Sequence, residues 1–149
     1  MRIGIDLGGT KIEAAAIDNS NRLSGRRRVP TPCGDYEATL ARVGDLVRAI
    51  ECDCGGGRRG AVGIGIPGTI SPATRLVKNA NSTCLIGRPL DRDLERLLDR
   101  PVRIANDADC FALSEATDGA AAAAGIAFGV ILGTGVGAGI VVGGHLLRG

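Results

Sequence analysis

The sequence is poor in aromatic residues, with two phenylalanines, one tyrosine and no tryptophan among 149 residues. Its 24 glycines predict a core of aliphatic side chains over closely approaching backbones. Four arginines cluster within residues 22–28, but no aromatic residue lies beside them. A nucleic-acid site would combine basic and aromatic side chains, so we interpret the cluster as the solvated edge of a sheet.

An excess of charge of one sign is also absent, because 18 lysines and arginines oppose 16 aspartates and glutamates. The resulting net charge of +2 predicts no nucleic-acid partner and no membrane partner. No apolar run reaches the about 20 residues of a membrane-spanning helix. Met1 leads directly into a strand-like segment without a signal-peptide pattern, so we expect a cytoplasmic protein.

Histidine is nearly missing, which limits the metal sites that the chain can form. The single histidine, His145, lies far along the chain from Cys52 and Cys54, and no second close pair of cysteines is present. Two thiolates alone are a poor zinc site, so we expect no metal site here. Five cysteines are an odd number in a chain without an export signal, which predicts reduced thiols rather than disulfides.

The N-terminus contains a glycine turn between two apolar segments. Residues 3–7 alternate apolar with polar or small side chains, and residues 12–17 resume an apolar run, as in a β-hairpin. The turn's two glycines permit positive φ and close approach to a ligand, and the threonine and lysine after them add a hydroxyl and an ammonium group. The turn is a candidate phosphate-binding loop, and the alternative is an ordinary hairpin turn.

One residue of the first apolar segment, Asp6, carries a charge. A carboxylate inside an otherwise apolar strand is costly to bury unless it binds a metal ion or joins a hydrogen-bond network. Asp6 therefore favours a functional loop over an ordinary turn.

The middle of the chain alternates strand and helix patterns. Apolar residues recur at helical spacing after Asp35, a candidate N-cap, until a run of glycines at residues 55–57 ends the helix. Residues 67–72 and 78–83 are polar segments typical of loops and turns. In chain order, we predict strands over residues 22–29, 61–66 and 102–105 and helices over residues 36–50, 90–99 and 107–124.

Residues 128–142 repeat the layout of the N-terminal hairpin, with a turn at Gly133, Thr134 and Gly135 between two apolar segments. Two such hairpins, separated by a β-α-β-α pattern, indicate an internal duplication. Two glycine turns can hold a polyphosphate between them, one on each side, so we expect the second turn to complete a phosphate clamp.

Five short motifs occur in the order Asp6-Leu-Gly-Gly-Thr-Lys11, Gly65-Ile-Pro-Gly68, Lys78-Asn-Ala-Asn81, Ala105-Asn-Asp-Ala-Asp109 and Leu132-Gly-Thr-Gly-Val-Gly-Ala-Gly139. Together they resemble the motifs of the ROK sugar kinases, within the actin, hexokinase and heat-shock ATPase superfamily. Five motifs in the right order are specific where any one would be weak. The resemblance covers essentially the whole chain and implies an α/β, ribonuclease-H-like lobe whose mixed sheet is flanked by helices.

The resemblance implies an ATP-dependent hexose kinase that uses Mg²⁺. Residues 78–83 and the dipeptide Thr31-Pro32 are similar to the bacterial fructokinase branch, so we expect fructose to be converted to fructose 6-phosphate. Asp107 matches the catalytic aspartate that takes the proton of the sugar hydroxyl as that hydroxyl attacks the γ-phosphate. Asn106 matches a ligand of the sugar hydroxyls; the alternative is that it caps a helix, and both roles can hold together.

Other roles follow from the resemblance at matching positions only. The implied sugar-binding residues are Gly68, Asn81, Asn106 and Asp107. The implied phosphate-binding residues are Asp6, Gly8, Gly9, Thr10, Lys11, Gly133, Thr134 and Gly135.

The chain departs from the family pattern in several places. Cys84 stands where an aromatic residue is expected, and Asp109 stands where asparagine is usual. The family continues with a Glu-x-x-His sugar-binding segment, a cysteine-rich zinc motif and the rest of a nucleotide lobe, and these 149 residues contain none of them. The family's structural zinc is therefore not expected in this chain. We predict an N-terminal lobe over residues 1–118 and the truncated start of a second lobe over residues 119–149.

Two alternatives to a kinase follow from the same observations. One is a non-catalytic sugar- or nucleotide-binding fragment or pseudoenzyme, because half of the nucleotide cleft is lacking. The other, a transcriptional repressor of the family, is disfavoured because those proteins carry a helix-turn-helix ahead of the first hairpin, which here begins at Met1. We also expect the apolar hairpin over residues 128–142 to expose area that drives self-association or homo-oligomer formation.

Overall fold

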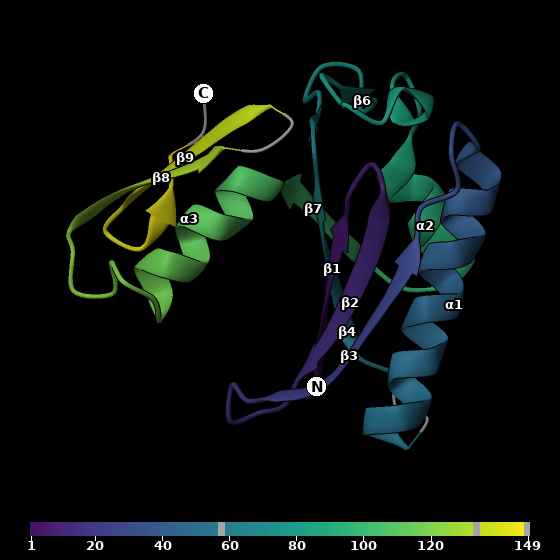
Figure 1. The fold of residues 1–149 in the computed structure, drawn as a ribbon, viewed down its shortest axis with the longest axis horizontal. Coiled ribbons are helices and arrows are strands. Elements are labelled where there is room, and N and C mark those ends of the chain that lie inside the picture. The colour runs from purple at the N-terminus through teal and green to yellow at the C-terminus, as the bar shows by residue number, and fades with distance from the viewer. Residues whose placement is uncertain (57–58, 133–134, 148–149) are drawn as a thin grey trace. The chain divides into compact units, whose positions relative to one another are not determined.

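The structure is a computed structural model that describes residues 1–56, 59–132 and 135–147. The chain has an α/β fold and forms two compact units, Met1–Ala105 and Asn106–Gly149 (Figure 1). The predicted fold class, a mixed sheet flanked by helices, is confirmed in the first unit. Within the described residues, no helix combines the length and the apolar character that crossing a bilayer requires.

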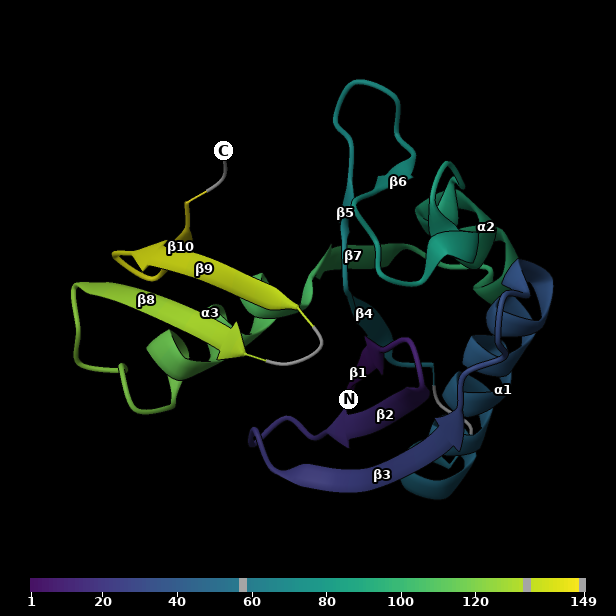
Figure 2. The same cartoon turned by 45° about the horizontal axis from the view of Figure 1, so that its top comes forward.

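A five-stranded mixed sheet, in the order β3-β2-β1-β4-β7, forms the centre of the first unit (Figure 2). β1 runs antiparallel to β2 and parallel to β4, so the carboxyl ends of β1 and β4 lie at the same edge of the sheet. The loops that follow these two strands are therefore brought together. The strands are β1 (Arg2–Leu7), β2 (Lys11–Ile17), β3 (Leu23–Pro30), β4 (Ala61–Ile66) and β7 (Val102–Asn106).

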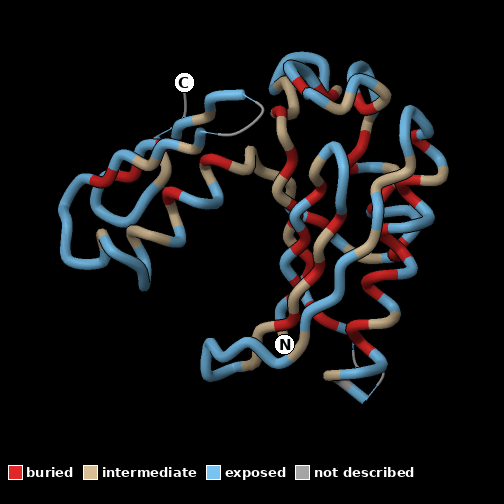
Figure 3. Tube along the Cα trace, viewed as in Figure 1, coloured by how far each residue is buried: buried red, intermediate tan, exposed pale blue. Residues whose placement is uncertain are grey.

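Two helices, α1 (Tyr36–Gly55) and α2 (Leu90–Leu98), pack on each other, and α1 also packs on β2 and β3. α1 begins where predicted, because the Asp35 carboxylate accepts a hydrogen bond from the Ala38 amide at 2.9 Å. It ends at Gly55, and the C-cap residue Gly56 adopts the left-handed conformation. Figure 3 shows buried residues along the strands and on α1. The core includes Ile3, Ile5, Leu7, Ile12, Val43, Val47, Ile50, Ile64, Ile66, Leu85 and Leu94.

The segment between β4 and α2 contains short elements that sequence periodicity did not predict. β5 (Thr69–Ile70) pairs antiparallel with β6 (Val77–Lys78), and η1 (Thr83–Leu85) follows. Elements of two or three residues are too short to show a period of their own. The segments that were predicted as polar loops therefore contain a short, ordered hairpin, which follows the end of β4.

The second unit packs one helix, α3 (Asp107–Thr117), against a β-hairpin of β8 (Ile126–Leu132) and β9 (Val136–Val142), and β10 (His145–Leu146) extends this sheet. Glycines permit the close contact. A Cβ at Gly129 would lie 2.9 Å from the Cβ of Ala112, and one at Gly139 would lie 2.8 Å from the Ala108 carbonyl.

The helix that begins at Asp107 is shorter than its predicted range of 107–124. It ends at Thr117, and turns follow despite the alanines there. The Glu115 carboxylate accepts a hydrogen bond from the Ala120 amide at 2.8 Å, which stabilises a non-helical path. The structure groups α3 with the second unit, whereas the predicted lobe boundary lay after residue 118.

Candidate active site

The glycine turn closes the β1–β2 hairpin and follows the carboxyl end of β1. The Gly8 amide donates to the Lys11 carbonyl at 3.0 Å, and a Cβ at Gly8 would lie only 3.0 Å from that oxygen. Gly9, Thr10 and Lys11 are exposed. An exposed turn with backbone amides and an ammonium group is chemically suited to an anion such as a phosphate.

Thr31 holds this turn on one side. Its hydroxyl donates to the Gly8 carbonyl at 2.8 Å, and its amide donates to the Thr10 carbonyl at 3.1 Å. Sequence reasoning used Thr31 only as part of a family-like dipeptide and missed this contact. Periodicity gives no sign of it, because the contact depends on the pairing of Lys11 with Pro30 across β2 and β3.

Gly68 and Asn81, predicted to bind sugar, lie on two segments that pack closely. A Cβ at Gly68 would lie 2.9 Å from the Lys78 carbonyl and 3.0 Å from the Cα of Ala80, so only glycine fits without a shift. The Asn81 amide donates to the Pro67 carbonyl at 3.2 Å. These contacts fix the backbone of Asn81. The residue itself is exposed and therefore available to a ligand.

Ser82 joins the asparagine segment to the glycine turn. Its hydroxyl oxygen is 3.5 Å from the position of a Cβ at Gly9. That oxygen is buried, and no hydrogen-bond partner for it occurs in the part of the chain that the structure describes. Sequence reasoning named Asn81 but missed Ser82. The structure therefore brings together Gly9, Gly68 and Asn81, which are far apart in the sequence.

Asp6 is exposed, so the concern that the strand would bury its carboxylate is wrong for this structure. The alternation of β1 places Ile3, Ile5 and Leu7 in the core and Asp6 on the opposite face. Its register partners are Glu13 on β2 and Gly65 on β4. A carboxylate on this face, beside the glycine turn, is the oxygen donor that Mg²⁺ prefers.

Glu13 belongs to a charged cluster on the same sheet. Its carboxylate accepts hydrogen bonds from Arg26 and Arg28 on β3. The hydrogen bond from Arg26 is the main cause that lowers the pKa of Glu13 below its ordinary range. Arg26 and Arg28 therefore lie on the edge strand β3 and pair with a carboxylate on the neighbouring strand β2, in agreement with the interpretation of the arginine cluster as a sheet edge.

Asn106 and Asp107 lie where β7 ends and α3 begins. The Asn106 side-chain oxygen accepts hydrogen bonds from the amides of Ala108 at 3.0 Å and Asp109 at 3.4 Å, so Asn106 is the N-cap that was considered as an alternative. The Asp107 carboxylate accepts from the Ala108 amide at 2.8 Å, and Asp107 is half-buried. A carboxylate held at a helix N-terminus in this way is a fixed acceptor for a proton.

The second phosphate turn is only partly visible. Gly133 and Thr134 lie outside the described residues, and Gly135 directly precedes β9. Asp107 and Gly135 belong to the second unit and the first glycine turn to the first unit, so the predicted two-sided clamp remains a prediction. Over residues 1–56, 59–132 and 135–147, no group of three or more histidine, cysteine, aspartate or glutamate side chains could hold a metal ion.

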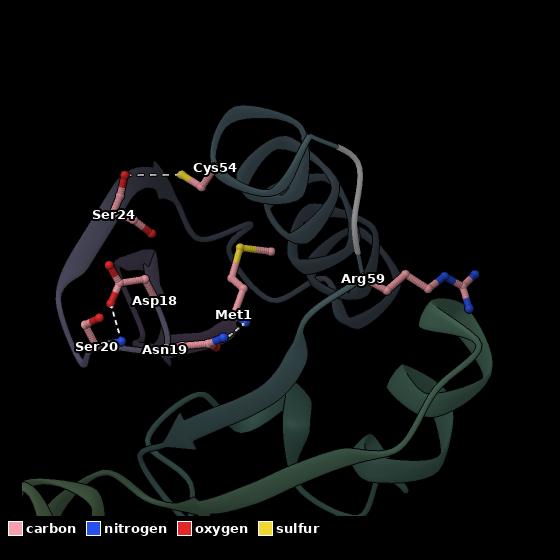
Figure 4. Close-up of a pocket in the computed structure, with 7 residues that line it drawn as sticks. All are labelled: Met1, Asp18, Asn19, Ser20, Ser24, Cys54 and Arg59. Carbon is pink, nitrogen blue, oxygen red and sulfur yellow. Dashed lines mark hydrogen bonds between the residues drawn. The ribbon is translucent and has the colours of Figure 1, made fainter.

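An open cavity of about 620 Å³ lies at the other end of β1 from the glycine turn. In Figure 4 the Arg59 side chain points away from the other residues, and it donates to the Asp99 carbonyl at 3.1 Å. The Cys54 thiol donates to the Ser24 carbonyl at 3.4 Å. A strand the length of β1 separates the cavity from the turn by roughly 20 Å, so the two are distinct. The lining residues are Met1, Asp18, Asn19, Ser20, Ser24, Cys54 and Arg59.

The chain matches a known family and known proteins over nearly its whole length. The model of the ROK family matches residues 2–149. The chain is 46% identical over 149 residues to an N-acetyl-D-glucosamine kinase of Yersinia pseudotuberculosis serotype O:3 (strain YPIII), a match that covers 100% of this chain and 48% of that protein.

Two solved structures are similar to the whole chain. The ROK hexokinase of Thermus thermophilus has a TM-score of 0.81 and 33% identity, covering 99% of this chain and 49% of that one. A ROK family glucokinase of Streptomyces griseus, in complex with glucose and AMPPNP, has a TM-score of 0.82 and 32% identity, covering 99% and 46%. The chain spans about half the length of these relatives.

Proposed function

This chain belongs to the ROK family, and from that premise we propose that it supplies the sugar-binding lobe and the catalytic base of an ATP-dependent hexose kinase. The observation that carries the proposal is the junction of β7 and α3, where the Ala108 amide in the first turn of the helix donates to the half-buried carboxylate of Asp107. Phosphoryl transfer requires mainly alignment and charge neutralisation, and a fixed carboxylate meets the first requirement.

In the proposed reaction, Asp107 accepts the proton of the sugar hydroxyl as its oxygen attacks the γ-phosphate of ATP. Asn81, Asn106 and the backbone at Gly68 bind the other hydroxyls of the sugar. The amides and ammonium group of the glycine turn bind phosphate oxygens, together with the Gly133, Thr134 and Gly135 turn. Mg²⁺ would neutralise charge on the phosphates, with the Asp6 carboxylate as the donor on this chain.

The relatives favour an aldohexose or its N-acetyl derivative as substrate. They include an N-acetyl-D-glucosamine kinase at 46% identity and a glucokinase structure that contains glucose. We therefore propose N-acetyl-D-glucosamine as the first sugar to test, with glucose second. Fructose, which the sequence resemblance predicted, has no support among these relatives and is the third sugar of the assay.

The proposal is tested with a full-length protein that carries this lobe. We expect release of ADP that requires both ATP and one of the three sugars, measured by a coupled assay. Calorimetric sugar binding without ADP release would favour the alternative, a non-catalytic binding protein. If the protein neither binds nor phosphorylates any of the three sugars, the proposal is wrong.

A further inference from the structure

Thr31 makes two hydrogen bonds to the glycine turn that no assigned role explains. Its hydroxyl bonds the Gly8 carbonyl at 2.8 Å, and its amide bonds the Thr10 carbonyl at 3.1 Å. Thr31 is half-buried, while Gly9, Thr10 and Lys11 are exposed. Thr31 therefore anchors the turn on its half-buried side, and the turn residues Gly9, Thr10 and Lys11 remain exposed to solvent.

The peptide bonds of the turn are trans, so each N–H points opposite to the carbonyl of the same peptide unit. The Gly8 carbonyl shares its peptide with the Gly9 amide, and the Thr10 carbonyl shares its peptide with the Lys11 amide. Because Thr31 holds both carbonyls, it directs the amides of Gly9 and Lys11 away from itself. Two amides directed in this way can both donate hydrogen bonds to an anion.

The local sequence holds Thr31 in place. Pro32 follows it, and a residue before proline is confined to extended backbone conformations. Pro30, the last residue of β3, is the register partner of Lys11 at the start of β2. Thr31 thus continues the β2–β3 pairing as far as the turn. Because Pro32 restricts its backbone, Thr31 loses little conformational entropy when it makes these contacts.

From these contacts, and on the premise of the proposed function, we infer that Thr31 is a positioning residue that aims the Gly9 and Lys11 amides of the glycine turn at phosphate oxygens of the nucleotide. Thr31 does not touch the phosphate. It acts through the carbonyls of Gly8 and Thr10, and its hydroxyl is the part that a substitution can remove without disturbing the backbone bond.

The test uses the 149-residue chain and inorganic triphosphate with Mg²⁺ as the probe. We expect the amide NMR resonances of Gly9 and Lys11 to move as the probe is titrated. The isosteric Thr31→Val variant removes the hydroxyl bond and is expected to raise the half-saturating probe concentration roughly fivefold, as loss of one hydrogen bond predicts. Thr31→Ser keeps the hydroxyl and is expected to stay within about twofold of the wild type.

Thr39→Val is the matched control. The Thr39 hydroxyl also donates to a backbone carbonyl, that of Asp35, at 2.7 Å, but it lies within α1 and away from the turn. This variant is expected to lose stability while its probe titration stays unchanged. A purely structural role for Thr31 would give the same pattern in Thr31→Val.

Kinetics of the full-length protein provide the second readout. Thr31→Val is expected to raise the KM for ATP and to leave the KM for the sugar unchanged. An unchanged titration and unchanged KM for ATP in Thr31→Val would overturn the inference while the kinase proposal stands on the wild-type activity. Absence of any shift at Gly9 and Lys11 in the wild type would overturn it together with the phosphate role of the turn.

Discussion

At the scale of single residues, Asp107 carries the sharpest prediction. Asp107→Asn keeps the size of the side chain and an oxygen able to accept from the Ala108 amide, but an amide cannot take up the proton of the sugar hydroxyl. We expect the full-length variant to lose about 10²- to 10⁴-fold in kcat, with sugar binding retained. Steady-state kinetics and calorimetry measure the two quantities.

The control for this substitution is Asp118→Asn, at the C-terminal cap of the same helix. It removes a carboxylate that directly follows α3 and leaves the proposed base unchanged, and we expect its kcat to equal that of the wild type. If Asp107→Asn turns over within a few-fold of the wild type, Asp107 has no part in the proton transfer.

The Ser82 and Thr39 hydroxyls lead to opposite predictions for stability. A buried hydroxyl without a partner costs free energy, so Ser82→Ala is expected to leave the midpoint of thermal unfolding unchanged or to raise it. The Thr39 hydroxyl is also buried but has a partner, and Thr39→Val is expected to cost about 1 kcal/mol. Thermal unfolding of both variants checks this contrast. A marked loss of stability in Ser82→Ala would mean that the hydroxyl has a partner in solution.

At the scale of elements, a buried ion pair ties α1 to the segments that flank β4 and β7. The Glu51 carboxylate accepts from the Gly60 amide at 2.7 Å and pairs with Arg100, which in turn donates to the Gly60 carbonyl at 2.8 Å. Glu51 is only 7% exposed. The hydrogen bond from Arg100 is the main cause that lowers the pKa of Glu51 below its ordinary value of 4.5.

Glu51→Gln removes the charge and leaves the Arg100 guanidinium buried beside a neutral amide. We expect the free energy of unfolding to fall by roughly 3 kcal/mol at neutral pH. Because the pKa is lower in the folded state, the wild type holds this stabilisation in full above pH 4.5 and loses it as the pH falls further.

The measurement is urea unfolding of wild type and Glu51→Gln at neutral pH and at about pH 3. The difference between the two proteins is expected to shrink at the lower pH. Asp45→Asn is the control, since Asp45 pairs with Arg48 at the surface and its loss is expected to change little at either pH. A difference that is independent of pH would show that the carboxylate charge is not what stabilises this junction.

At the scale of the whole molecule, one face of the β8–β9 hairpin is apolar and exposed. The other face packs on α3, but the outward face exposes apolar side chains from both strands, including Phe128, Leu132 and Val136. Leu132 is 80% exposed and its register partner Val136 is 79% exposed. A contiguous apolar surface of this kind drives association.

We therefore expect the 149-residue chain to self-associate through this face. A double variant, Phe128→Lys with Leu132→Lys, is expected to lower the mass measured by light scattering, because two charges oppose burial of the face. Leu23→Lys, at a 63% exposed apolar residue of β3, is the control and should leave association unchanged. A wild-type chain that is monomeric at high concentration would contradict the prediction.

The sequence by itself determined the elements whose signals are local. The alternation around the first glycines predicted the β1–β2 hairpin, the strand at Ala61–Ile66 was predicted with the same bounds, and Asp35 was identified as the cap of α1. The cap at Asn106 was also among the predicted alternatives. Each of these depends on residues within a few positions of one another, where side-chain period and capping chemistry are decisive.

Tertiary structure decided what contacts what. Thr31 reaches the turn across a strand register, Ser82 reaches Gly9 from a different loop, and α3 packs on β8 and β9 because glycines there lack a Cβ. The solvent exposure of Asp6 likewise depends on which face of the sheet the helices cover. Such contacts join segments far apart in the chain, and their free energy comes from packing and hydrogen bonds that form only when the strands have paired, so no local pattern in the sequence records them.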